Sequence, residues 1–450
     1  MVAAVETHET NAARAEAPPP AHDPEHPSPV VGVSKPRMLS VLGPGLITGA
    51  SDDDPSGIAT YSQAGAQFGT ALGWTMLLCF PLMVAVQMVS ARIGRTTGEG
   101  LARNLKRHGH PALLHVIVWL VVFANIINIG ADLSAMGASV ELVGGGPRWA
   151  WVLAFGVLSI LMQVFMQYTS YVAWLKWLTL ALFAYVATLF LAHVPWGAAL
   201  TDLVWPKITW SQDYATTVVA VLGTTISPYL FFWQASQEAE DIRAFPRRAA
   251  LVYRPQQAEG ALQRIRLDTI VGMGVSNFVG LAIIWTTAAT LHARGVTDIQ
   301  TSADAARALE PIAGAVATIV FALGVVGTGI LAIPVLAGSA AYAVGEARGW
   351  KTGLGRQPLE AVSFYVAVAL ATLLGMGVTF MPMDPIKALY WSAVINGAVA
   401  VPVIAAMMSL AARRKVMGNF PVRGLLAWTG WATMIFMAAA TLFMVGSWFV

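Results

Sequence analysis

Residues 49–58, GASDDDPSGI, and residues 223–229, GTTISPY, interrupt two otherwise apolar stretches, and they decide the fold of this chain. Proline removes a backbone donor and clashes with the preceding turn, while glycine tolerates unwound angles. Both stretches are therefore predicted to be helices that are broken at Pro55 and Pro228. Asp54 directly precedes the first proline, and an ionisable group within an apolar helix is costly enough to indicate function.

The composition around these two breaks is that of a membrane protein. Of the 450 residues, 56% are hydrophobic and only 11% are charged, and the mean hydropathy is +0.63. These values exclude an ordinary soluble globule. The apolar runs are continuous rather than alternating, which predicts helices and excludes a barrel. The single cysteine, Cys79, excludes an internal disulfide framework.

Eleven apolar segments are predicted, each long enough to cross roughly 30 Å of hydrocarbon. They lie near residues 39–66, 70–92, 112–136, 149–167, 171–193, 214–238, 268–291, 313–344, 360–381, 385–411 and 425–449. The broken segments are the first and the sixth. Discontinuous helices at matching places predict an all-α integral membrane protein built as two inverted five-helix halves, with the eleventh helix as an addition and the site between the breaks.

The flanking regions predict the domain boundaries and the orientation. Residues 1–37, rich in Ala, Pro, Glu and His, are expected to be a disordered cytoplasmic tail, and residues 38–450 to form the transmembrane transporter domain. No cleavable signal is visible. With the N-terminus inside, 22 of the 27 basic residues fall on the cytoplasmic side, as the positive-inside rule demands, and the C-terminus lies outside. A multi-pass protein of a bacterial-type inner membrane is predicted.

Motifs in several segments match one known family in order and spacing. They are Gly43-Pro44-Gly45, Asp54-Pro55, Ala59-Thr60 and Gln63-Ala64-Gly65-Ala66 in the first segment, Ser90-Ala91-Arg92-Ile93-Gly94 and Thr97-Gly98 after the second, and Gly223 to Pro228 in the sixth. In these motifs the chain resembles the NRAMP family of divalent metal-ion transporters over residues 39–450. The resemblance implies eleven helices in a LeuT-like 5+5 inverted repeat, and a divalent cation site between the unwound segments.

The chain departs from the family's pattern at the two breaks. Where the family reads Asp-Pro-Gly-Asn, this chain has Asp54-Pro55-Ser56-Gly57, and where it reads Met-Pro-His, this chain has Ser227-Pro228-Tyr229. Oxygen donors suit Mg²⁺, Ca²⁺ and Mn²⁺, whereas sulfur selects softer ions. The smaller side chains also leave room for the waters that Mg²⁺ retains. The departures resemble the NRAMP-related magnesium transporter branch, and they predict a site formed by Asp54, Gly57, Thr224 and Ser227.

Proton coupling is expected to be absent. The positions of two family histidines are taken by Tyr229 and Gln234, and in the third segment Asp132 remains while the second carboxylate of the family is Ala135. A relay needs a chain of titratable groups, and this one is broken. The predicted driving forces are the metal gradient and the membrane potential, worth about 2.3 kcal/mol per charge per 100 mV.

Further polar residues are predicted to line the pathway or to support the site. Of the neighbours Asp52 and Asp53, at most one is expected to line the pathway, because adjacent helix positions face different directions. Asp132 either serves ions or pairs with a basic neighbour, and the ion pair is favoured. Asn277 and Asn396 either contact hydrating waters or bond across helices. Three acids at the cytoplasmic end of the sixth segment are interpreted as solvated caps, namely Glu238, Glu240 and Asp241.

The predicted function is uptake of Mg²⁺ and Mn²⁺ by a secondary transporter that is not an enzyme, uses no cofactor and binds no nucleic acid. No nucleotide-binding loop is present, which excludes an ATP-driven pump. Two alternatives stay open: a proton-coupled Mn²⁺/Fe²⁺ transporter of the same family, and an organic solute permease of the same fold. A non-transporting receptor is less well supported, because the sequence shows no sensing domain. The oligomeric state is not predicted.

Overall fold

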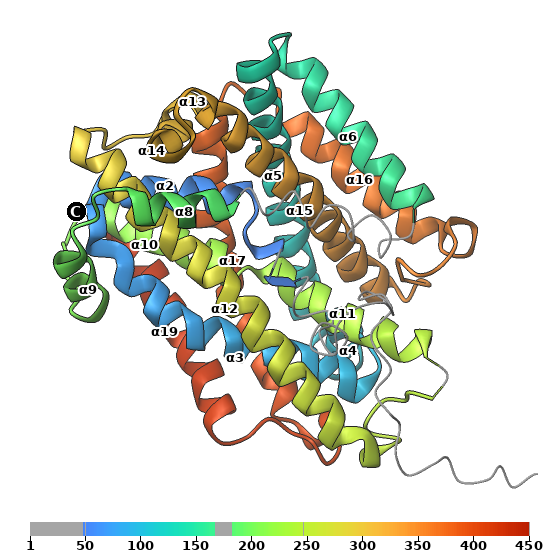
Figure 1. The fold of residues 1–450 in the computed structure, drawn as a ribbon. Coiled ribbons are helices and arrows are strands. Elements are labelled where there is room, and N and C mark those ends of the chain that lie inside the picture. Colours follow the sequence, from blue (N-terminus) through green and yellow to red (C-terminus); the bar gives the residue numbers. More distant parts are fainter. Residues whose placement is uncertain (1–47, 50, 167–181, 246, 450) are drawn as a thin grey trace, which may run out of the picture.

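The computed structural model describes residues 48–49, 51–166, 182–245 and 247–449, and these form helices joined by turns, without a strand among them. The predicted tail, residues 1–37, lies outside the described residues, and so does the first part of the fifth predicted segment. Figure 1 shows the helices gathered into one bundle.

The helix bounds follow the apolar segments. In chain order they are α2 (Pro55–Phe68), α3 (Gly73–Thr97), α4 (Leu101–His108), α5 (Pro111–Gly144), α6 (Arg148–Phe165), α8 (Phe183–Leu191), α9 (Trp196–Val204), α10 (Gln212–Thr225), α11 (Pro228–Ala244), α12 (Ala258–Thr290), α13 (Ser302–Ala306), α14 (Glu310–Ala313), α15 (Ala317–Arg348), α16 (Val362–Val378), α17 (Pro385–Ala411), α18 (Arg414–Met417) and α19 (Leu425–Ser447). Short 3₁₀ turns join some of them, such as η1 (Gly69–Leu72) between α2 and α3.

Eight helical stretches within the described residues are long and apolar enough to cross a membrane. One of these stretches contains both α2 and α3, and another contains both α10 and α11. The shorter α16 is also apolar, with 17 residues. Each predicted segment thus has a helix at its place, although for the fifth segment only α8 is described.

Helix ends follow local chemistry where the sequence supplies a signal. The α3 helix ends at Gly98 and α15 at Gly349, which adopt the left-handed conformation with φ of 71° and 84°; glycine adopts it without steric cost. The structure corrects the predicted start of α12, which begins at Ala258 and not near residue 268. Its first three turns carry charged residues, so a hydropathy window does not detect them.

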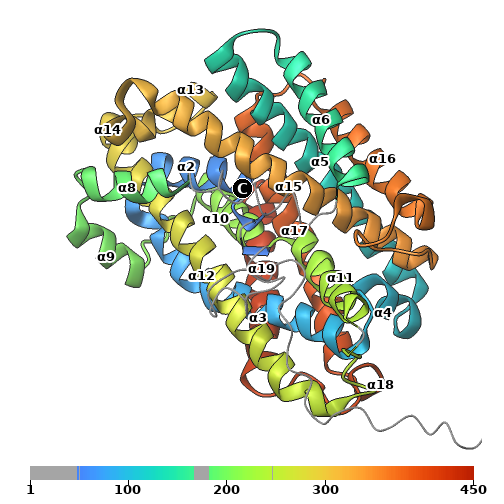
Figure 2. The same cartoon turned by 45° about the vertical axis from the view of Figure 1, so that its right-hand side comes forward.

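The broken pair α10 and α11 lies in the middle of the bundle. The most apolar window of this pair is entirely buried, whereas only 22% of the window in α6 and 17% of that in α19 is buried. The latter two helices are therefore peripheral, and their apolar side chains suit contact with lipid. Figure 2 shows α10 in the middle of the bundle; α10 contacts α2, α17 and α19, and α11 contacts α3 and α15.

Two glycines allow helices to approach closely beside the breaks. A Cβ on Gly223 of α10 would overlap the Ala393 carbonyl of α17, and one on Gly49 would overlap the carbonyl of Gly272 in α12. Small residues permit such backbone contact between membrane helices. The segments on which the site depends are thus held directly against α12 and α17.

Candidate functional site

Both predicted helix breaks are present. Residues 51–52 are helical, Asp53 and Asp54 are not, and α2 begins at Pro55; likewise α10 ends at Thr225 and α11 begins at Pro228. The breaks face each other. A Cβ built on Gly57 would lie 3.3 Å from Thr224 Oγ1, so the first residues of α2 contact the last turn of α10.

The Asp54 carboxylate lies at the centre of this contact and is 1% exposed. Its Oδ1 accepts hydrogen bonds from Ser56 Oγ at 2.5 Å and from the Gly57 backbone N–H at 2.8 Å. Its Oδ2 accepts from Asn128 Nδ2 at 3.0 Å and lies 3.3 Å from the Tyr229 hydroxyl. Every donor among the described residues is neutral, so within that part of the chain the carboxylate is stabilised by dipoles and no cationic side chain neutralises it.

Four helix ends lie at the breaks. Two are N-terminal and two are C-terminal, so they carry partial charges of opposite sign. Asp54 caps the N-terminus of α2, and Ser227 is the N-cap of α11, so the positive ends of two helices lie here. The C-terminal ends of α10 and of the helical turn before Asp53 supply carbonyl oxygens. One of them, Ser51 O, lies 3.3 Å from the Tyr229 hydroxyl. Carbonyls and one carboxylate together form a surface suited to a cation.

The two predicted neutral ligands on α10 and at its break contribute oxygen. The Ser227 hydroxyl lies 2.9 Å from Gly223 O and 2.8 Å from Thr224 O, so its proton points back to α10 and its lone pairs remain available. Thr224 Oγ1 lies 3.4 Å from Ser56 Oγ. Gly57, the fourth predicted site residue, presents its N–H to Asp54. It supplies no side-chain ligand, and the room predicted beside it is absent, because a Cβ on Gly57 would lie within 3.5 Å of Thr224, Tyr61 and Asp52.

Among the described residues, no three His, Cys, Asp or Glu side chains come together to hold a metal ion. The candidate ligands are therefore one carboxylate together with hydroxyl, amide and carbonyl oxygens. Such a set suits a hard cation that keeps part of its water, because Mg²⁺ is usually held through one or two carboxylates.

Tyr229 and Gln234 lie at different distances from the break. Tyr229 contacts Asp54 directly. Gln234 lies further along α11, where its Oε1 accepts hydrogen bonds from Thr48 Oγ1 and from Gln87 Nε2. Gln234 thus connects α11 to Thr48, before the first break, and to α3. Among the described hydrogen bonds, none joins it to Asp54.

The reason given for separating Asp52 from Asp53 does not hold in the structure, and that at most one of them lines the pathway stays a prediction. The Ser276 hydroxyl of α12 lies 2.6 Å from Asp52 Oδ2 and 3.2 Å from Asp53 Oδ1, so both acids face the same side chain. Helical spacing does not separate them, because the helix ends between these two residues. Asn277, predicted to line the pathway, follows Ser276 on α12 and is only partly buried. In the described part of the chain, the Asn277 side-chain oxygen has no hydrogen-bond partner.

The ion pair favoured for Asp132 is wrong for the part of the chain that the structure describes. Asp132 of α5 is fully buried, and neither carboxylate oxygen has a partner there. The α5 helix packs mainly against α15, α16, α17 and α6, and no ion pair among the described residues includes Asp132. Asn396 of α17 is 1% exposed, and both of its amide atoms also lack partners among the described residues. It lies one helical turn beyond Ser392, on the same face.

Sequence reasoning missed four residues of the site. Asn128 and Ser56 donate to Asp54, Ser392 donates to Asn128, and Ser276 contacts Asp52 and Asp53. Only Ser56 carried a signal, because it stands two residues from Asp54, where a hydroxyl reaches back to the carboxylate. The others are single polar residues in apolar helices, distant in sequence.

A second group of buried acids lies at the far end of α11, and it corrects the interpretation of solvated caps. Glu238 is fully buried and accepts from Arg264 Nη2 at 2.6 Å. Asp241, also buried, pairs with Arg248. Glu240 accepts from the Tyr342 hydroxyl and from two backbone N–H groups. The prediction failed because the seventh segment was predicted to start near residue 268, whereas α12 starts at Ala258 and includes Arg264.

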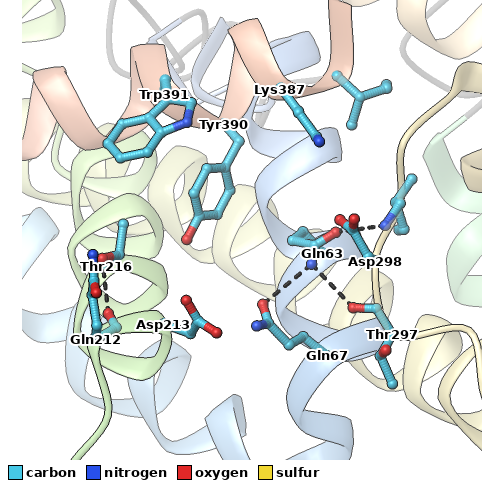
Figure 3. A pocket seen from close by; sticks show the side chains of 12 residues that line it. Gln63, Gln67, Gln212, Asp213, Thr216, Thr297, Asp298, Lys387, Tyr390 and Trp391 are labelled. Atoms are coloured by element: carbon cyan, nitrogen blue, oxygen red, sulfur yellow. Dashed lines mark hydrogen bonds between the residues drawn. The ribbon is translucent and has the colours of Figure 1, made fainter. Parts of the chain in front are cut away.

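A pocket opens at the opposite end of α2 and α10, with a volume of about 510 Å³ (Figure 3). The Tyr390 side chain points into it, and the Tyr390 hydroxyl lies 2.8 Å from Thr217 Oγ1. Thr216 on the pocket wall is eight residues before Thr224, or about 12 Å along the helix axis. The lining residues are Gln63, Gln67, Gln212, Asp213, Thr216, Thr297, Asp298, Ile299, Ile386, Lys387, Tyr390 and Trp391.

Known proteins resemble this chain in sequence and in fold. The divalent metal cation transporter MntH of Acidiphilium cryptum is 25% identical over 400 residues, which are 86% of each chain. The manganese transporter of Eremococcus coleocola, solved with an aromatic bis-isothiourea substituted compound, has a TM-score of 0.70 at 16% identity, over 94% of this chain and 89% of that one.

A second structural neighbour is MhsT in complex with L-phenylalanine, with a TM-score of 0.58 at 12% identity, over 90% of this chain and 98% of that one. These likenesses confirm the predicted LeuT-like helical fold. The expectation of a transporter rather than an enzyme agrees with the relatives, which are named as transporters. The family model described as natural resistance-associated macrophage protein-like matches residues 45–447, and the chain therefore belongs to the Nramp family.

Proposed function

We propose that this protein carries divalent metal cations across a membrane, and that its site takes the hard ions Mg²⁺ and Mn²⁺ with part of their hydration water. The observation that carries the proposal is the Asp54 carboxylate, buried between two helix breaks and surrounded by neutral oxygen-bearing groups. The relatives named as divalent metal cation and manganese transporters support the same class of cargo.

The ligand types support the preference for hard ions. Ser227 offers a hydroxyl where the resemblance implies a thioether, and its proton is directed at α10 carbonyls, so oxygen lone pairs face away from them. Gly57 packs closely against Thr224 and adds no side-chain donor of its own. A site of this kind favours an ion that binds oxygen and keeps water.

The proposed orientation has the N-terminus in the cytoplasm and the C-terminus outside. Transport is proposed to be uncoupled from protons. Tyr229 and Gln234 hold the positions implied for two histidines, and both engage in hydrogen bonds with the residues around the first break. Neither side chain titrates near neutral pH. The pocket beyond Tyr390 would then be the outer approach to the site.

One observation favours a second candidate, proton-coupled transport of Mn²⁺ or Fe²⁺. Asp132 is a buried carboxylate without a partner among the described residues, one helical turn from Asn128. Such a group could carry a proton. An organic solute permease is less well supported, because the α2 N-terminus, which would have to receive a substrate carboxylate, is already capped by Asp54.

The test is flux into proteoliposomes with internal metal and pH followed together. Wild-type protein is expected to take up Mg²⁺ and Mn²⁺ without acidification, whereas Asp54→Ala loses at least about 100-fold in rate because the charged group among the proposed ligands is gone. Glu259→Gln, at an exposed position in the first turn of α12, is the matched control and should transport normally.

Two results would contradict the proposal. Strong uptake of Fe²⁺ or Cd²⁺ without Mg²⁺ uptake would refute the hard-ion preference. Metal-dependent acidification that disappears in Asp132→Asn, with metal flux retained, would instead establish the proton-coupled candidate.

A further inference from the structure

Asn128 joins three helices at the site. It lies on α5 and is fully buried; its Nδ2 donates to Asp54 Oδ2 at 3.0 Å, and its Oδ1 accepts from Ser392 Oγ of α17 at 2.6 Å. A side-chain amide offers two donors and one acceptor group, and here both ends are engaged. The amide therefore connects Asp54 directly to α17.

The Ser392 hydroxyl has a second acceptor within reach. Its Oγ lies 2.7 Å from the Leu389 carbonyl, as well as 2.6 Å from Asn128 Oδ1. A hydroxyl carries a single proton, so it donates fully to one of these oxygens at a time. When the proton turns to Leu389 O, the Ser392 oxygen is free to accept a hydrogen bond from Asn128.

A cation at Asp54 changes which orientation of the amide is favourable. In the structure, the Asn128 N–H donates to the Asp54 carboxylate. This orientation is favourable without an ion, but it would direct the N–H dipole at the positive charge of a bound cation. Rotating the amide by half a turn presents Oδ1 to the ion and Nδ2 to Ser392 Oγ. Since Ser392 then donates to Leu389 O, no buried polar group is left without a partner.

We propose that Asn128 is a cation-contacting residue that reverses its amide when the site fills, with Ser392 as the positioning residue that accepts either orientation. The resemblance implies an asparagine where this chain has Gly57 on α2. Asn128 would supply the corresponding amide oxygen from α5. An amide oxygen is a good ligand for a hard cation, bound directly or through its water. The inference rests on the proposed function, because it assumes a cation at Asp54.

The experiment compares Asn128→Leu with Asn125→Leu in the same flux assay and in metal titrations of purified protein. Asn125 is a matched control: it is a fully buried asparagine one turn earlier on α5, and its Nδ2 donates to Leu336 O at 2.9 Å, away from Asp54. Asn128→Leu is expected to raise the KM and the dissociation constant for Mg²⁺ about tenfold with kcat little changed. Asn125→Leu should leave both constants unchanged.

A third variant separates contact with the ion from mere support of Asp54. Asn128→Asp keeps an oxygen and loses the N–H, so the proposal predicts a KM for Mg²⁺ at or below the wild-type value. If the N–H only holds Asp54 in place, this variant is the worst of the series, because two carboxylates then repel each other. Ser392→Ala should raise the KM a few-fold, since the rotated amide loses its acceptor.

The outcomes distinguish the two proposals. Loss of flux in Asp54→Ala together with an unchanged KM in Asn128→Leu would overturn the role of Asn128 alone. Absence of divalent cation flux in the wild-type protein would overturn the proposed function itself. If Asn128→Leu does not fold, Asn128→Ala takes its place in the same comparison with Asn125→Ala.

Discussion

Two groups of buried carboxylates lie along the broken helices, and they differ in what neutralises them. At the breaks, the described residues that donate hydrogen bonds to Asp54 are all neutral. At the far end of α11, Glu238 and Asp241 pair with arginines. Burying an ion is expensive unless a partner compensates it. The paired acids carry their countercharge within the protein, whereas Asp54 is compensated in full only when a mobile cation arrives.

The difference explains why the two groups have different roles. A carboxylate locked to an arginine cannot release its countercharge, so it fixes the position of one helix against another. Glu238 and Arg264 hold α11 to α12 in this way. A carboxylate held by dipoles can exchange one set of partners for another at little cost. This is the property that a transport site needs, because the ion must leave as readily as it enters.

The largest expected effect comes from breaking the paired group. Arg264→Met leaves Glu238 buried without its main countercharge, and the loss of stability should be about 3–5 kcal/mol. The double variant Arg264→Met, Glu238→Leu removes both charges, and it should recover most of that loss. Thermal unfolding of the purified protein in detergent measures both variants. If the single and double variants are equally unstable, the ion pair is not what stabilises this end.

Sequence reasoning located the breaks because proline and an acid in an apolar run are strong local signals. Asp54, Pro55 and Pro228 all lie where they were predicted to lie. Asn128 and Ser392 gave no such signal, since single amides and hydroxyls in membrane helices mostly bond across helices without a further role. Their contact with each other spans 264 positions in the sequence, and only the folded bundle brings them together.

The paired group escaped prediction for a different reason. Hydropathy marks where a helix is apolar and not where it ends. The predicted start of α12 near residue 268 therefore placed Arg264 in solvent, although the helix begins at Ala258. A charged turn that continues an apolar helix is detected from sequence only when its partner is known, and Glu238 lies 26 positions away on another helix.

A smaller effect is expected from changing the donor set of the unpaired group. Ser227→Met replaces an oxygen donor by a thioether, which favours softer ions. We expect the ratio of KM values for Mg²⁺ and Cd²⁺ to shift about tenfold toward Cd²⁺, roughly the 1.4 kcal/mol of a single improved contact. Ser227→Leu is the matched control, because it adds similar bulk without sulfur. An equal shift in both variants would show that size, and not the donor atom, sets the preference.

The smallest effect is expected at a pair in which the acid is buried but its basic partner is exposed to water. Asp202 of α9 lies 2.7 Å from Lys207 Nζ and accepts from Thr70 Oγ1 at 2.6 Å. Partial burial alone would raise the pKa of Asp202, but the hydrogen bonds from Lys207 and Thr70 and the charge of Lys207 outweigh it and lower that pKa.

A lowered pKa in the folded state makes the pair stabilising above the ordinary pKa of an aspartate, near 3.9. This stabilisation is lost as the pH falls through the lowered value. Because the Lys207 side chain is 66% exposed, Lys207→Met should cost less than about 1 kcal/mol at neutral pH, and less again in high salt. Thermal unfolding of wild type and variant should converge as the solution becomes acidic. A difference that persists at low pH would mean that Lys207 contributes through packing of its methylene chain and not through its charge.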